Sequence, residues 1–164
     1  MRQGAKNRGF TLIEILVVIL IIGIILGVTL LAPRSSGPAQ ALLDESQRLQ
    51  LLMEQARDRA LLDGQEYGLS ATEDRYYWWR WSRDDEAWRK FEDAHYRPHQ
   101  LSDRIHMEVI EPVPSNLPGN EQKPLIVMYS DGLISPFQLN LYMETDRQQT
   151  VQLSSDGFSA VSIP

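Results

Sequence analysis

The stretch from Arg8 to Ala32, which decides the fold, reads RGFTLIEILVVILIIGIILGVTLLA. From Phe10 to the end of this stretch, only Glu14 has an ionisable side chain. A helix needs about 20 mostly apolar residues to cross the hydrocarbon core of a bilayer. Residues 10–32 are therefore predicted to form a transmembrane helix.

Charged side chains are distributed unevenly around this apolar block. Arg2, Lys6 and Arg8 precede it without an acidic neighbour. Residues 33–164 carry 13 bases and 21 acids, which gives a net charge of −8. Because basic flanks of a membrane helix stay in the cytoplasm, we expect a cytoplasmic N-terminus and a periplasmic domain on a bacterial inner membrane.

The acidic excess argues against a nucleic-acid partner, and the absence of cysteine leaves the fold without disulfides.

Three interpretations of the N-terminus compete. A cleaved secretory signal has a shorter apolar core and ends at a small-residue site, which residues 31–33 match poorly. A plain signal anchor fits the length and charges but leaves Glu14 unexplained, because a carboxylate inside a bilayer costs about 2.5–3.5 kcal/mol. A polymerising helix explains it. If cleavage after Gly9 frees the amine of Phe10, that amine can pair with the Glu14 carboxylate of a neighbouring subunit.

Residues 8–14, RGFTLIE, followed by an apolar run, resemble the class III signal of type IV pilins and pseudopilins. The resemblance implies that residues 1–9 are a leader peptide, which prepilin peptidase removes by cutting between Gly9 and Phe10. It also implies that the new N-terminal residue, Phe10, is N-methylated. Glu14 takes the position of the acid that this family requires for filament assembly.

A second helix is predicted after a break at Pro33. This proline lacks a backbone donor and is expected to kink or interrupt the first helix. Pro38 suits the first turn of a resumed helix, and Gly64 is expected to end it. Residues 33–64 are thus predicted to continue as an amphipathic helix that packs on the protein's own sheet. Its apolar stripe consists of Leu42, Leu49, Met53, Ala56 and Ala60.

From residue 65 onward the pattern changes from helix to strand. Short alternating segments are separated by turn signals, among them Asp131-Gly132 and Asp156-Gly157, and residues 111–124 are predicted to form a proline-rich loop. Seven or eight strands predict a β-sandwich over residues 65–164. The expected fold class is α+β, a long N-terminal helix packed on an antiparallel β-sandwich. The expected strands are 66–71, 75–81, 87–91, 104–110, 125–129, 137–143, 149–153 and 158–163.

Residues 129–137, YSDGLISPF, indicate one group within this family. They are similar to a segment of the H-type minor pseudopilins of the type II secretion system. That similarity implies a structural subunit at or near the tip of a periplasmic pseudopilus, which supports export of folded exoproteins through the outer membrane. The implied partners are the other minor pseudopilins, the major pseudopilin, prepilin peptidase and the inner-membrane secretion platform. The implied location is the inner membrane, with a single pass, before incorporation into the pseudopilus.

A minor pilin of a type IV pilus, acting in pilus priming or DNA uptake, is the alternative, because it shares the signal at residues 9–14. A DNA-binding pilin should carry a basic patch in its C-terminal part. Residues 125–164 contain one base, Arg147, and four acids. This charge balance favours the secretion system.

Aromatic side chains are concentrated in residues 76–91. Alternation along a strand places Tyr77, Trp79 and Trp81 on one face, with Tyr76 and Trp78 on the other. One face can form core, while the second is either covered by the hairpin or free to contact a partner. Core packing is the first interpretation of these rings. A partner contact through Trp78, Trp79 and Trp81 is the second, and stacking on sugar or single-stranded nucleic acid is the third.

The sequence offers no convergent set of catalytic or metal-binding residues. His95 and His99 have the spacing of a helical metal pair, but Pro98 lies between them and cysteine is absent. The acids at 84–86 fit a solvated turn, and neither a nucleophile elbow nor a phosphate-binding glycine loop is present. We therefore expect no enzymatic activity, no cofactor and no metal.

Overall fold

The computed structural model describes residues 12–31, 37–110 and 124–163, with side chains in the first of these ranges only up to Ile24. The chain divides into two compact units, Met1–Ser35 and Ser36–Pro164. The predicted leader peptide, its cleavage site, Pro33 and all but the last residue of the predicted loop at 111–124 lie outside the described residues.

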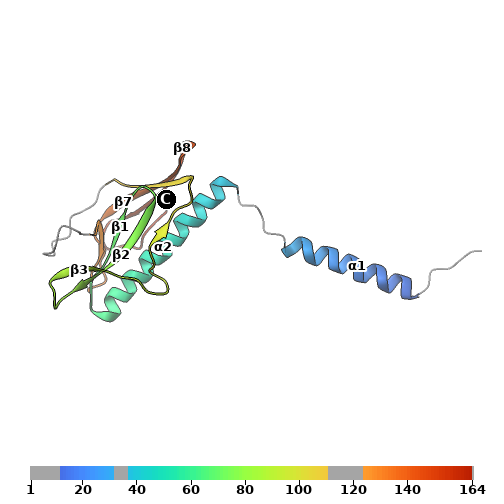
Figure 1. The fold of residues 1–164 in the computed structure, drawn as a ribbon, viewed down its shortest axis with the longest axis horizontal. Coiled ribbons are helices and arrows are strands. Elements are labelled where there is room, and N and C mark those ends of the chain that lie inside the picture. Colours follow the sequence, from blue (N-terminus) through green and yellow to red (C-terminus); the bar gives the residue numbers. More distant parts are fainter. Residues whose placement is uncertain (1–11, 32–36, 111–123, 164) are drawn as a thin grey trace, which may run out of the picture. The chain divides into compact units, whose positions relative to one another are not determined.

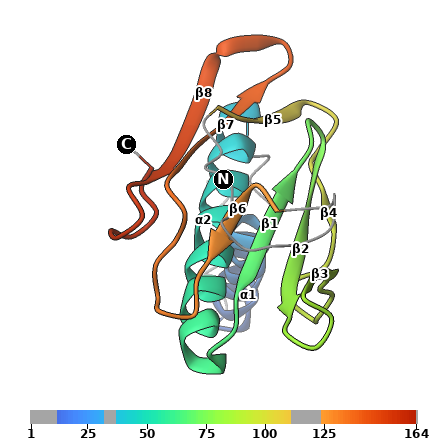
Figure 2. The same ribbon diagram turned by 90° about the vertical axis from the view of Figure 1, so that its left-hand side faces the viewer.

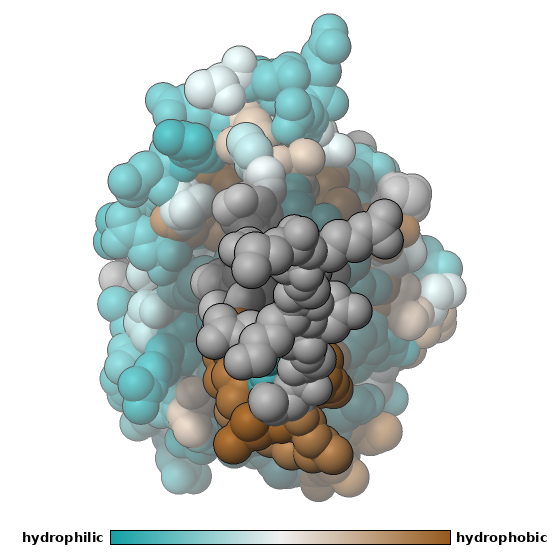
Figure 3. Space-filling model, turned by 90° about the vertical axis from the view of Figure 1, so that its right-hand side faces the viewer, coloured by the Kyte–Doolittle hydropathy of each residue, from teal (hydrophilic) through white to brown (hydrophobic). Residues whose placement is uncertain are grey.

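The described part of the first unit is helix α1, Leu12–Leu31 (Figure 1). Its side chains from Leu12 to Ile24 are all exposed. In Figure 3 they form a brown, hydrophobic surface, whereas the surface of the second unit is mainly teal. Among the helices whose residues are described, none meets the length and apolar content required to cross a membrane.

The second unit begins with helix α2, Pro38–Asp63. Pro38 occupies its first turn, as predicted, and Gly64 follows its end in a left-handed conformation (φ 59°), with its amide donating to Ala60 O. The predicted apolar stripe is confirmed as the buried face. Ser46 shares that face, and its hydroxyl is satisfied locally because it donates to Leu42 O at 2.7 Å.

The larger sheet, sheet A, has five antiparallel strands in the order β3-β2-β1-β6, with β4 also beside β2. On the side away from β1, β2 pairs with two short strands. Its residues 79–82 pair with β3, and its residues 75–76 pair with β4. The short β4 was not among the strands expected from the sequence. The strands are β1 (Tyr67–Ala71), β2 (Arg75–Ser82), β3 (Ala87–Lys90), β4 (His99–Gln100) and β6 (Ile126–Met128).

The smaller sheet, sheet B, has three antiparallel strands in the order β5-β7-β8. These are β5 (Ile105–Val109), β7 (Phe137–Met143) and β8 (Asp146–Ser155). The predicted last strand at 158–163 is wrong, because this segment makes only an isolated bridge between Ser154 and Ser162. Four of its backbone groups, those of Phe158 O, Ser159 O, Val161 N and Val161 O, bond to side chains of α2 instead.

Both sheets lie on the same side of α2 (Figures 1 and 2). The buried face of α2 and the inward faces of both sheets contribute to one hydrophobic core, in which Trp78, Tyr67 and Tyr76 are the largest fully buried residues. The α+β class, a helix packed against antiparallel sheets, is therefore confirmed.

Candidate functional site

The residues predicted to act in processing and assembly are only partly described. Gly9 and Phe10 lie outside the described residues, and Glu14 is in the first turn of α1 with its side chain exposed. From Leu12 to Ile24 it is the only ionisable group. A helix that is apolar all round requires lipid or protein around it. Glu14 is thus the one group on this stretch that can accept a charged hydrogen-bond donor in such surroundings.

The three tryptophans predicted as candidate partner contacts lie in the interior. Trp78 is 1% exposed, and Trp79 and Trp81 are each 6% exposed. Trp78 belongs to the main core, while the other two belong to a second cluster on the opposite face of sheet A. With so little ring surface exposed, the structure favours the core interpretation over a partner contact.

The second cluster depends on a glycine of β1, Gly68, because the rings of Pro124 and Trp88 pack directly against its backbone. Trp79, Trp81, Trp88 and Val127 form this cluster. A Cβ at Gly68 would stand 2.5 Å from the Pro124 ring and 3.2 Å from the Trp88 ring, so any larger residue would displace them. Sheet A is consequently apolar on both faces, and the glycine within the strand was the sequence signal for this close approach.

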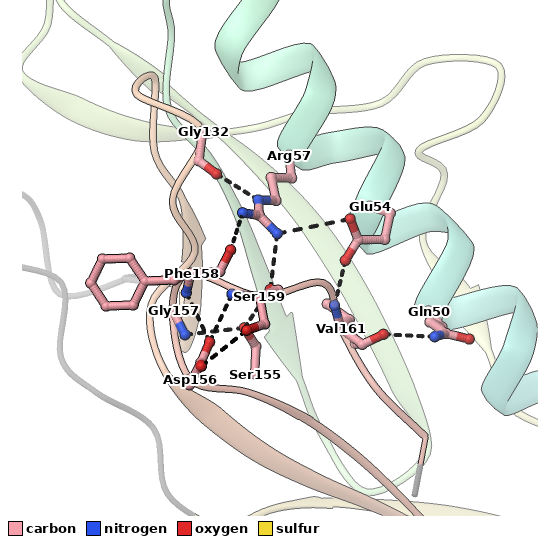
Figure 4. A network of polar contacts seen from close by, with 10 residues as sticks. All are labelled: Gln50, Glu54, Arg57, Gly132, Ser155, Asp156, Gly157, Phe158, Ser159 and Val161. Atoms are coloured by element: carbon pink, nitrogen blue, oxygen red, sulfur yellow. Dashed lines mark hydrogen bonds and ion pairs between the residues drawn. The ribbon is translucent and has the colours of Figure 1, made fainter.

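The C-terminal segment is fastened to α2 by side-chain hydrogen bonds (Figure 4). Arg57 donates to three carbonyl oxygens, those of Gly132 at 2.5 Å, Phe158 at 2.7 Å and Ser159 at 3.0 Å. Glu54 accepts the Val161 amide at 2.5 Å, and Gln50 donates to Val161 O at 2.6 Å. Backbone groups that leave a sheet need other partners, and α2 supplies them here.

A second polar cluster lies at the C-terminal end of α2. Arg59 bonds Asp93 at 2.9 Å and Asp63 at 3.3 Å, and its guanidinium lies 5.1–5.8 Å from the ring centroids of Phe91, Tyr96 and Tyr67. The Tyr67 hydroxyl donates to Asp63 at 2.7 Å. Burial, and then this hydrogen bond, raise the pKa of Tyr67 to about 12, and the same bond lowers the pKa of Asp63.

Tyr67→Phe is expected to make the free energy of unfolding fall less steeply as the pH rises above 10. A tyrosine whose pKa rises to about 12 on folding adds stability below its unfolded value, about 10, and this stability is lost as the pH rises toward 12. The difference in unfolding free energy between wild type and Tyr67→Phe should therefore be constant below pH 10 and should shrink above it. Chemical denaturation from pH 8 to pH 12 measures this, and parallel curves would contradict the linkage.

The histidines are distributed among separate sites. His99 Nε2 lies 3.0 Å from Glu45 of α2, which fixes β4 to the helix. His106 stacks on Tyr142 and lies 3.6 Å from Glu73 and 4.0 Å from Glu144. Over residues 12–31, 37–110 and 124–163, no group of three His, Asp or Glu side chains could hold a metal ion.

Two family descriptions match the chain. Residues 4–30 match the "Prokaryotic N-terminal methylation motif", and residues 45–157 match "Type II transport protein GspH". The N-terminal match covers the predicted cleavage site and Glu14. The second match covers most of α2 and the strands of both sheets.

Relatives agree with these matches. The chain is 33% identical over 159 residues to type II secretion system protein H of Pseudomonas aeruginosa, covering 93% of this chain and 92% of the relative. It is 29% identical over 141 residues to the protein of the same name from Escherichia coli, covering 82% and 80%.

Solved structures share the fold. The solution structure of Escherichia coli GspH superposes with a TM-score of 0.63 at 18% identity, covering 81% of this chain and 94% of that one. The minor pseudopilin EpsH from the type II secretion system of Vibrio cholerae gives 0.57 at 17% identity, covering 73% and 91%. With a family match over most of the globular unit and a relative of 33% identity over nearly its whole length, the chain belongs to the GspH family, the H-type pseudopilins of type II secretion.

Proposed function

We propose that this protein is a structural, non-enzymatic subunit that α1 first anchors in the inner membrane and later fixes in the pseudopilus. Prepilin peptidase removes residues 1–9, and the amine of Phe10 is methylated. The Ser36–Pro164 unit lies in the periplasm and takes a place at or near the filament tip. There it contacts the other minor pseudopilins and the major pseudopilin while folded exoproteins pass through the outer membrane.

The observation that carries this proposal is the chemistry of α1. Eleven large apolar side chains between Leu12 and Ile24 are 44–84% exposed, and Glu14 is the only ionisable residue among them. Such a helix is unstable in water. Lipid can surround it before assembly, and the helices of neighbouring subunits can surround it afterwards. The carboxylate at its start, unfavourable in lipid, gains a partner only in the assembled state.

Deletion of the gene in its own host, with restoration from a plasmid, tests the function. The assay is a folded exoenzyme in the medium, measured together with DNA uptake and pilus-driven motility. We expect the exoenzyme to accumulate in the periplasm while uptake and motility remain normal, and the plasmid to restore export. Normal export with failed uptake or motility would make the protein a type IV minor pilin instead.

A further inference from the structure

Phe158 is the one aromatic side chain, among those in the described part of the chain, that is largely exposed. It is 74% exposed, whereas the other aromatic rings there are buried or half-buried. Figure 4 shows its ring directed away from α2 and from the polar network beneath it. The ring therefore contributes little to the hydrophobic core. A single exposed apolar residue is common on protein surfaces, so the case for function depends on how this residue is held.

Both backbone groups of Phe158 are fixed by side chains. Its amide donates to Asp156 Oδ1 at 2.9 Å, and its carbonyl accepts from Arg57 Nη2 at 2.7 Å. Ser159 is held in the same way, by Asp156 at 2.8 Å and by Arg57 at 3.0 Å. One carboxylate and one guanidinium from distant parts of the chain thus clamp two consecutive residues.

The residue before the ring is held as firmly. Gly157 has φ 101°, a conformation that disfavours other residues. Its amide donates to Ser155 Oγ at 3.1 Å, and its carbonyl accepts the Ile134 amide at 3.1 Å. The loop is therefore tied to α2, to the end of β8 and to the segment before β7. Only the two side-chain torsions of Phe158 remain to be fixed on binding.

An exposed leucine and two acids lie close to the backbone groups that Arg57 binds. Leu61, 55% exposed, lies 3.7 Å from the position of a Cβ at Gly132, the residue whose carbonyl also bonds Arg57. Asp131 directly precedes Gly132, and Asp156 lies two residues before Phe158, so each of these two Arg57-bound residues has an acid beside it in the chain. Hydrogen bonds from Ser159 and then Phe158 lower the pKa of Asp156, so this acid is ionised at neutral pH.

We propose that Phe158 anchors this subunit to a different pilin-like subunit of the filament, by entering an apolar pocket whose rim carries Lys or Arg opposite Asp131 and Asp156. This inference rests on the proposed function, because it assumes that the chain assembles with other subunits. A clamped aromatic loses little conformational entropy on binding, and buried aromatic anchors contribute most of the affinity in many interfaces.

The charge of the chain selects the kind of partner. A second copy would bring the same acids, since residues 33–164 carry a net charge of −8 and residues 125–163 contain only one base. Like charges across an interface oppose association. A rigid anchor also suits a partner of constant shape, whereas exported proteins differ from one another in shape. A different, basic subunit therefore fits the surface best.

Photo-crosslinking in the host tests the contact. A photoreactive phenylalanine analogue is placed at position 158 of the full chain, and at Arg89, an exposed residue of β3, as the control. We expect an adduct at position 158 and none at position 89. Mass spectrometry should identify the second protein in the adduct as a different protein whose precursor sequence begins with a class III signal. An adduct with a second copy, an adduct with an exoprotein, or no adduct would each overturn the proposal.

Substitutions separate binding from folding. Phe158→Ala should reduce copurification of that subunit about tenfold or more without changing the unfolding midpoint, while Phe158→Tyr should retain binding. The Leu133 amide donates a hydrogen bond to Asp131 Oδ1 at 3.0 Å. Asp131→Asn keeps an oxygen that can accept this hydrogen bond but removes the negative charge. It should weaken binding most at low salt. If wild type restores export and Phe158→Ala copurifies equally well, the anchor is refuted while the proposed function stands.

Discussion

Trp78→Ala is expected to lower the free energy of unfolding of the Ser36–Pro164 unit by about 3–5 kcal/mol. The indole is 1% exposed and lies in β2, inside sheet A. It packs edge-on against Tyr96, with ring centroids 5.0 Å apart, and against Tyr76 at 6.3 Å. Alanine would leave a large cavity among these rings. Because small domains are stable by only about 5–15 kcal/mol, this loss is a large share of the total.

Trp78→Phe should be much milder than Trp78→Ala. The Trp78 Nε1 group is buried and has no hydrogen-bond acceptor within reach among the described residues, so the native state already carries the cost of an unsatisfied donor. Phenylalanine keeps a ring and removes that donor. Trp79 is the matched contrast, because its Nε1 donates to Ser70 Oγ at 2.9 Å. Trp79→Phe loses a hydrogen bond as well as ring volume and should cost more than Trp78→Phe.

Guanidinium unfolding of the purified full chain in detergent, followed by far-ultraviolet circular dichroism, measures all three variants without relying on tryptophan fluorescence. Equal destabilisation by Trp78→Phe and Trp79→Phe would show that the Trp78 donor has a partner in solution. A Trp78→Ala midpoint near that of wild type would show that the ring is not part of the core.

Local patterns predicted the elements whose stabilising contacts are close in sequence. The helical repeat from Leu42 to Ala60 identified the buried face of α2, and Pro38 and Gly64 marked its first turn and its end. Alternation also assigned Trp78 and Trp79 to opposite faces of a strand. Periodicity could not show that both faces are covered, because the cover over the second face depends on Gly68 and on Pro124, which is far away in the sequence.

Contacts between distant residues were the ones that sequence reasoning missed. The Asp156-Gly157 turn predicted a hairpin into a last strand at 158–163. That segment instead bonds to Arg57, Glu54 and Gln50 of α2, about 100 residues earlier in the chain. Nothing in the local pattern distinguishes this arginine from the other charged residues on α2, and Phe158 had the apolar character expected of a strand.

Glu14→Ala is expected to leave processing and membrane insertion intact and to reduce incorporation into the filament about 30-fold or more. The size of this reduction follows from the free-energy cost of removing one member of a desolvated ion pair, which is at least about 2 kcal/mol. Insertion should not suffer, because alanine makes α1 more apolar and removes a charge that is unfavourable in lipid. Failure of the variant would therefore be assigned to assembly.

The nature of the substitution separates charge from shape. Glu14→Gln keeps the size and hydrogen-bonding capacity of the side chain but cannot pair with an amine as an anion, so it should fail almost as completely as alanine. Glu14→Asp keeps the charge on a shorter side chain and should retain part of the assembly. The order wild type, Asp, Gln, Ala is the signature of a charge pair, whereas a steric role would place Gln next to wild type.

The measurement compares three quantities for each variant: the cleaved fraction, the amount in the inner membrane, and the fraction that copurifies with the major subunit of the filament. Only the third should change, and export of a folded enzyme should fall with it. Equal incorporation of Glu14→Ala and wild type would exclude pairing between the Phe10 amine and the Glu14 carboxylate. The exposed carboxylate in the first turn of α1 would then need another explanation, since lipid alone disfavours it.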